Sequence, residues 1–170
     1  MKKCFLLMCI LIYASASNAQ CSPELRFKPL PMFSADTAAF VMYNFRDRGD
    51  CYKGKTFKNV LDDFGFKIKT FILVVDKDDP KRLIGIDVYP YEQNEIGRRN
   101  HFQLETHGIK IFLNEAMDAV KYLDFANRTK KNEWHRKIYN IFKNKTIRFT
   151  RSVIHHYSPY RETYKDQLED

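Results

Sequence analysis

The chain has 170 residues, of which 29 are Lys or Arg and 21 are Asp or Glu, so its formal net charge is +8. Its longest apolar run covers residues 4–14, which is shorter than the about 20 residues that cross a bilayer and so excludes a membrane-spanning helix. A chain of this length predicts a single domain that buries about 70% of its unfolded surface.

The first residues predict a leader for export. Two lysines follow the initial methionine, the apolar run comes next, and the small residues SASNA follow it. This layout is typical of a secretory signal peptide over residues 1–19, cleaved after Ala19. Lipoprotein anchoring through Cys21 would require a small residue directly before the cysteine, where the chain has Gln20. We therefore expect a periplasmic or extracellular protein, with charge +6 once Lys2 and Lys3 are removed.

Two cysteines remain after cleavage, Cys21 and Cys51. An even pair in an oxidising compartment predicts a disulfide. Closing this loop is worth about 3–4 kcal/mol on the chain-entropy model. Metal binding by the same pair would be expected with CxxC spacing, which the chain lacks.

The first third of the mature chain predicts an extended lead-in and two helices. Residues 20–33 hold three prolines and read as the lead-in. A helix is expected after an N-cap at Ser34, with Asp36 in its first turn, and Gly49 is expected to end it. A second helix is expected between an N-cap at Thr56 and a closing Gly65.

The rest of the chain predicts strands between helices. Residues 66–75 and 82–91 read as an antiparallel hairpin around the turn 76–81. A surface loop is expected over 92–100, one or two strands broken near Gly108 over 101–114, and a helix from Glu115. A further helix over about 132–142 precedes a last strand over 145–154, and residues 155–170 form a polar, tyrosine-rich tail. This order predicts an α+β fold for residues 34–154, a small antiparallel β-sheet with helices packed on one face.

The stretch GDCYKGKT, residues 49–56, fits the phosphate-loop pattern G-x-x-x-x-G-K-[ST]. A working phosphate loop needs a strand before its first glycine, but residues 40–48 have helical spacing. The alternating strands and helices of a parallel nucleotide-binding sheet are also missing. We therefore interpret the motif as a chance match and do not expect nucleotide binding. Lys53 and Lys55 remain candidates for binding another anion.

Basic residues gather towards the end of the chain. Between residues 128 and 151 only Glu133 is acidic, so this segment carries +8. The basic residues of this segment are Arg128, Lys130, Lys131, Arg136, Lys137, Lys143, Lys145, Arg148 and Arg151. Such asymmetry is typical of a surface for nucleic acid, anionic lipid or acidic polysaccharide, and also of a solvated basic face. Trp134 and Tyr139 interleave with the charges, although the spacing of Trp134 also fits a core position.

Catalytic and metal-binding patterns are sparse. His101, Glu105 and His107 would share one face if they lay on one strand, which makes them a candidate titratable cluster. Asp76, with its neighbours at 78 and 79, crowds one turn but lacks the loop-closing glutamate of a calcium site. We therefore expect no metal site and no cofactor. Two sequons, at Asn127 and Asn144, would accept glycans in a eukaryotic secretory pathway.

These observations favour a non-catalytic binding or structural module with an unknown protein or anionic partner outside the cytoplasm. A polyanion-binding protein that uses residues 128–151 is the first alternative. An exported enzyme of unidentified class is the second, and the sequence points to no catalytic residue for it.

Overall fold

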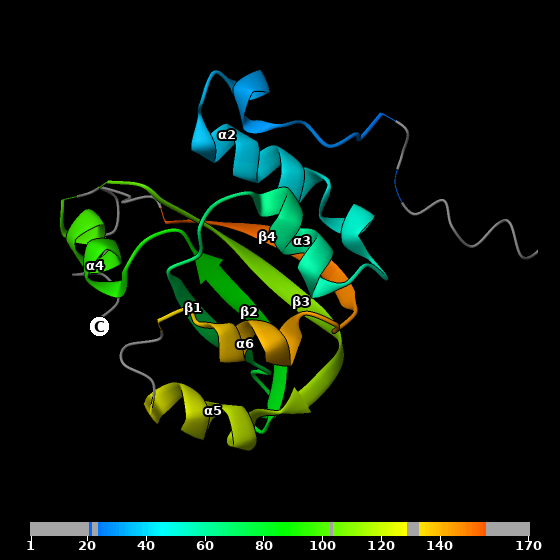
Figure 1. The fold of residues 1–170 in the computed structure, drawn as a ribbon, viewed down its shortest axis with the longest axis vertical. Coiled ribbons are helices and arrows are strands. Elements are labelled where there is room, and N and C mark those ends of the chain that lie inside the picture. The colour runs from blue at the N-terminus through cyan, green and yellow to red at the C-terminus, as the bar shows by residue number, and fades with distance from the viewer. Residues whose placement is uncertain (1–20, 22–23, 103, 129–132, 156–170) are drawn as a thin grey trace, which may run out of the picture.

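A computed structural model describes residues 21, 24–102, 104–128 and 133–155 of the chain (Figure 1). The predicted signal peptide, residues 156–170 of the predicted tail, Lys130 and Lys131 lie outside these residues. The described part confirms the α+β class, because it contains a four-stranded antiparallel sheet and five α-helices. The strands are ordered β1-β2-β3-β4, so each strand lies beside its neighbour in sequence.

The first helical segment differs from its prediction at its start. It comprises a 3-10 turn, Leu30–Phe33 (η1), helix α2 over Thr37–Val41, a π-helical stretch over Met42–Asp47 (η2) and a 3-10 turn over Gly49–Tyr52 (η3). Asp36 caps α2 by accepting from the backbone N–H of Ala39, whereas the predicted cap Ser34 adopts a left-handed φ of 52°. The segment ends close to the predicted Gly49, since η2 stops at Asp47 with Arg48 as its C-cap, and Gly49 then begins the separate turn η3.

Helix α3, Phe57–Phe64, forms as the sequence predicts. The Thr56 hydroxyl accepts from the backbone N–H of Asn59, and the Asn59 side chain accepts from the backbone N–H of Thr56, which completes a capping box. Gly65 ends the helix with a left-handed φ of 70°, a conformation that costs glycine little. Local signals therefore suffice to define both ends of α3.

The predicted hairpin is confirmed by β1, Thr70–Val75, and β2, Arg82–Tyr89, which pair antiparallel. The turn between them is closed by its aspartates, since Asp76 accepts from the backbone N–H of Asp78 and Asp79 accepts from that of Lys81. Strand β3, Thr106–Asp118, continues through Gly108 without a break. It reaches beyond residue 114 because Leu83 and Arg82 of β2 pair with Met117 and Asp118.

The later helices correct three expectations. The predicted loop over 92–100 is helix α4, Gln93–His101, with Ile96 as its one buried residue. The helix expected from Glu115 is α5, Ala119–Arg128, because residues 115–118 belong to β3. The helix expected over 132–142 is α6, Arg136–Phe142, where His135 is the N-cap. Strand β4, Ile147–His155, closes the described fold and pairs with β3.

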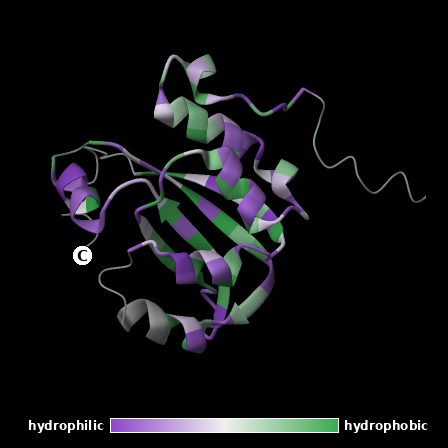
Figure 2. Cartoon of the chain, in the orientation of Figure 1, coloured by the Kyte–Doolittle hydropathy of each residue, from purple (hydrophilic) through white to green (hydrophobic). Residues whose placement is uncertain are grey.

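Alternation along the strands builds the core (Figure 2). The buried cluster takes Phe71, Ile86, Val88, Ile109 and Ile111 from the sheet and joins them to aromatic side chains of the helices. Those aromatic residues are Phe40, Phe45, Phe57, Phe64 and Phe142. In Figure 1, α2, α3 and α6 lie over the same side of the sheet. No helix in the described part of the chain has the length and apolar character to cross a membrane.

Candidate functional site

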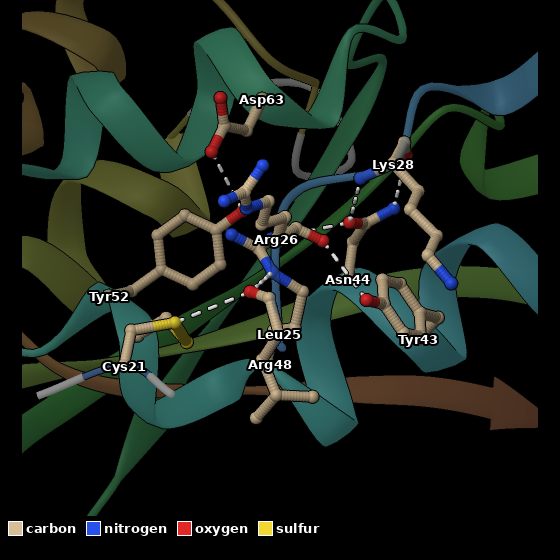
Figure 3. Close-up of a disulfide and its surroundings, with 10 residues drawn as sticks. Cys21, Leu25, Arg26, Lys28, Tyr43, Asn44, Arg48, Tyr52 and Asp63 are labelled. Atoms are coloured by element: carbon tan, nitrogen blue, oxygen red, sulfur yellow. Dashed lines mark hydrogen bonds between the residues drawn. A yellow bond between two sulfur atoms is a disulfide. The ribbon is translucent and has the colours of Figure 1, made fainter. Parts of the chain in front are cut away.

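The lead-in is held by side-chain hydrogen bonds to η2 and by a disulfide to η3 (Figure 3). Cys21 and Cys51 form the predicted disulfide, with their Cα atoms 4.6 Å apart. The Asn44 amide oxygen accepts from the backbone N–H of Lys28 at 3.2 Å, and its amide nitrogen donates to the Lys28 carbonyl at 2.8 Å. The buried Asn44 side chain therefore pairs with the lead-in as a neighbouring strand would.

Arg48 forms a second anchor for the lead-in. Only 5% of its surface is exposed, and its Nε donates to the Leu25 carbonyl at 2.7 Å. Its guanidinium carbon lies 5.6 Å from the ring centre of Phe27 and 5.8 Å from that of Tyr52. The Tyr52 hydroxyl donates to Asp63 at 2.9 Å, and burial, assisted by the Asp63 charge, raises the pKa of this phenol above its usual range. These contacts are structural, because each polar atom named here bonds within the protein.

The phosphate-loop-like stretch uses its backbone donors internally. From residue 53 to residue 58, each backbone N–H donates to an acceptor of the protein. The acceptors, in order, are the carbonyls of Asp50, Ile147 and Tyr52, the side chain of Asn59, and the carbonyls of Lys145 and Lys143. A phosphate loop instead leaves its N–H groups pointing at the ligand. In this described stretch, binding a phosphate through the backbone would require breaking bonds to the fold.

Two lysine-rich segments lie side by side although about 90 residues separate them in sequence. Residues 53–58 run antiparallel to residues 143–148, with a bridge between Thr56 and Thr146. Gly54 donates its backbone N–H to the Ile147 carbonyl at 2.8 Å, and Ile147 donates to the Lys55 carbonyl at 2.8 Å. We call the cations along this pairing and the adjoining β4 the basic edge. Its members are Lys53, Lys55, Lys143, Lys145, Arg148 and Arg151.

The basic edge has little internal charge compensation. Lys143 is half-buried and the other members are exposed. Arg151 lies 4.0 Å from Asp50, whose side chain is 77% exposed. Among the residues that the structure describes, none of the other five members forms an ion pair with Asp or Glu. The edge therefore presents uncompensated positive charge to solvent.

An aromatic pair lies within the basic edge. The ring centres of Phe112 in β3 and Phe149 in β4 are 4.4 Å apart. The guanidinium carbon of Arg151 is 4.7 Å from the centre of the Phe149 ring, and that of Arg148 is 5.7 Å away. Asp50, Lys53, Arg148 and Phe149 line an open depression of about 400 Å³ beside this pair. Cations from both lysine-rich segments thus meet around one aromatic ring.

The remaining predicted anion-binding residues are placed apart from this depression or are not described. Arg136 and Lys137 are exposed in the first turn of α6, about 10 Å along the helix from Lys143. Arg128 ends α5, and its side chain lies outside the described part, as do Lys130 and Lys131. Trp134 packs against Phe57 and Phe71, each with ring centres 6.3 Å away, and so contributes to the core.

The structure separates the predicted histidine cluster. His101 belongs to the end of α4, so it does not share a strand with Glu105 and His107. His107 Nε2 lies 3.8 Å from the Glu105 carboxylate, and His107 is 8% exposed. The aspartates of the turn 76–81 bond to neighbouring backbone groups, as described above. Among the described residues, no three His, Cys, Asp or Glu side chains are grouped to hold a metal ion.

One carboxylate is buried in the middle of the sheet. Asp87 of β2 is 7% exposed, and its Oδ2 lies 3.6 Å from Nζ of Lys110 on β3. Burial raises the pKa of Asp87 to about 6, and the Lys110 charge opposes this shift. Its Oδ1 is buried and has no hydrogen-bond partner among the described residues. Sequence reasoning missed this group because a single aspartate among β-branched residues gives no sign of burial.

Sequence reasoning also did not single out Phe112, Phe149, Arg148 and Arg151 as one group. A weak signal was present, because Phe112 and Phe149 lie in segments that alternate in hydropathy and so can face the same side of a sheet. The register that makes them neighbours is a long-range property.

Comparison of the chain with protein-family models, with curated proteins and with solved structures finds no match to any of them.

Proposed function

We propose that the protein is an exported, non-catalytic module that binds an anionic polymer on its basic edge. The observation that carries this proposal is the pairing of residues 53–58 with residues 143–148, which places two lysine-rich segments together. A linear polyanion attracts several such cations at once, and each contact releases counterions. Small anions lack this advantage, because they meet only one or two of the cations.

The engaged backbone of the phosphate-loop-like stretch supports a polymer over a nucleotide. A nucleotide needs backbone donors around its phosphates, and here those donors bond to η3, to α3, to β4 and to the residues between α6 and β4. The lysine side chains at 53 and 55 remain available to a ligand, because neither is paired with a carboxylate among the described residues. This arrangement suits contacts with the negative charges along an anionic polymer, and such contacts do not require an enclosed pocket.

Two further parts of the proposal rest on the sequence and on the register. Export rests on the leader over residues 1–19 and would place the disulfide in an oxidising compartment. We also propose that α2, α3 and α6 cover one face of the sheet and that a partner contacts the part of the opposite face around Phe112 and Phe149. Phe112 pairs with Phe149 and Lys110 pairs with Arg151, so these residues share the face opposite to Ile109 and Ile111 of the core.

Retention on heparin and phosphocellulose tests the proposal. The variant K53Q/K55Q/K145Q removes charge from the basic edge, and K67Q/K77Q/K81Q removes the same charge from exposed lysines elsewhere. We expect the first variant to elute at clearly lower salt than the wild type, because fewer counterions are released on binding. The second variant should elute close to the wild type. If both variants eluted at equally lowered salt concentrations, the retention would depend on net charge alone, and a defined binding site would be refuted.

A further inference from the structure

The aromatic pair of the basic edge provides more than charge. Phe149 has the Phe112 ring on one neighbouring strand and two guanidinium groups along its own strand. The side chain of Arg151 is 47% exposed, so this stack of ring and guanidinium reaches solvent. Flat groups of this kind are the platforms on which unpaired nucleic-acid bases stack. The depression beside Phe149 leaves space for a base next to the platform.

We propose that the anionic polymer is a single-stranded nucleic acid, with a base stacked on the Phe149–Arg151 platform and its phosphates along the basic edge. This inference rests on the proposed function and names its ligand. Lys53, which lines the same depression as Arg148 and Phe149, would contact the phosphate next to the stacked base. The cations of the basic edge would contact the flanking phosphates, and such contacts do not depend on the base sequence.

The platform favours a nucleic acid over an acidic polysaccharide. Every base has a π face, and stacking on an aromatic side chain adds to affinity for any base. A sulfated or carboxylated sugar chain carries the negative charge but has no aromatic face to match Phe149 and the guanidinium groups. A duplex keeps its bases stacked on one another, so it offers the platform only phosphates. Single strands alone use both features of the site.

A fluorescence-anisotropy titration of the disulfide-bonded protein tests this inference. The probe is a labelled oligothymidylate of about 12 nucleotides, a length that covers one such site. The comparison ligand is an abasic oligonucleotide of the same length and charge. We expect the abasic strand to bind about tenfold more weakly, which corresponds to the loss of one stacked base.

Each outcome of this titration decides a different question. Equal affinity for the two strands, or displacement of both by heparin at lower concentration than by unlabelled oligothymidylate, would overturn the nucleic-acid inference and leave polyanion binding standing. The absence of binding to every polyanion would refute the proposed function itself. Stronger binding of duplex than of single strand would overturn the stacking role.

Variants separate the platform from the charge. Phe149→Leu keeps an apolar contact with Phe112 but removes the ring, and Arg151→Lys keeps the charge but removes the planar group. We expect both to lower affinity for oligothymidylate and to leave affinity for the abasic strand unchanged. Phe102→Ala removes an aromatic ring that is 66% exposed at the end of α4 and serves as the matched control. If Phe149→Leu weakened the binding of oligothymidylate and of the abasic strand equally, with unchanged thermal stability, this result would contradict a stacking role.

Discussion

Gly49 lies directly against the backbone of Thr150 in β4. A Cβ added to Gly49 would stand 2.2 Å from the Thr150 carbonyl oxygen, closer than real Cβ contacts allow. The Thr150 hydroxyl also donates to the Phe45 carbonyl at 2.9 Å, so η2, η3 and β4 are fastened together at this point. Glycine is required here for close approach of two backbones, and its φ is not left-handed.

We expect Gly49→Ala to lower the free energy of unfolding by about 3 kcal/mol, because the obstacle is backbone that can move only with the strand. Gly97→Ala is the matched control, since Gly97 is exposed in α4 and nothing lies within 4 Å of its added Cβ. That substitution should stabilise the protein by up to about 1 kcal/mol. Urea unfolding measures both, and a neutral Gly49→Ala would contradict the contact with Thr150.

The buried amide of Asn44 is one of the anchors of the lead-in. Asn44→Ala would leave the backbone N–H and carbonyl of Lys28 without their partner and would remove the acceptor of Arg48 Nη1. We expect a loss of about 3 kcal/mol in unfolding free energy and faster proteolytic cleavage within residues 24–33. Asn100→Ala, at an exposed position of α4, should change neither quantity. Unchanged cleavage of the lead-in in the Asn44 variant would show that other contacts hold it.

The disulfide provides a third measurable contribution. Replacing Cys21 and Cys51 together by Ser opens a link between residues 30 apart in sequence, and we expect a loss of about 3–4 kcal/mol. A reductant should destabilise the wild type by a similar amount and leave the double variant unaffected. Two thiols that react freely in the native protein under non-reducing conditions would contradict the link.

Asp87 makes stability depend on pH in an unusual direction. Its pKa of about 6 in the folded chain lies above its ordinary value of 3.8, so the folded state binds the proton more tightly than the unfolded state. The carboxyl group therefore favours folding most below about pH 4, and this contribution is lost as the pH rises through about 6. At higher pH the buried charge costs up to about 3 kcal/mol, because each unit of pKa shift is worth about 1.4 kcal/mol.

Asp87→Asn tests this contribution across the pH range. The variant should exceed the wild type in stability above about pH 6, and the difference should shrink as the pH falls towards 4. Lys110→Met should have the opposite effect at high pH, since the Lys110 charge lies 3.6 Å from the carboxylate and offsets part of its burial. A difference between wild type and Asp87→Asn that stays constant with pH would contradict the assignment.

The sequence predicted those elements whose signals are local. Thr56 and Gly65 define α3 through a capping box and a left-handed terminus, and both features are set within one helix. The aspartates after Val75 define the turn of the first hairpin in the same way. The sheet class followed because alternating segments were short and were separated by turns.

Long-range contacts decided what the sequence did not predict. Helix α4 was missed because Ile96 is its one buried residue and the Glu92 side chain gives no capping bond. The role of Gly49 depends on a strand about 100 residues further along the chain. In the candidate site, the basic residues were visible in the sequence, but the pairing of Gly54 with Ile147 that joins them was not.

The pairing of residues 53–58 with residues 143–148 constrains the order in which the polypeptide folds. Residues 45–58 obtain hydrogen-bond partners from residues 143–150, which lie far along the chain from them. The helical region over residues 45–58 therefore completes its hydrogen bonds only after residues 143–150 are available, and contacts between such distant residues form slowly.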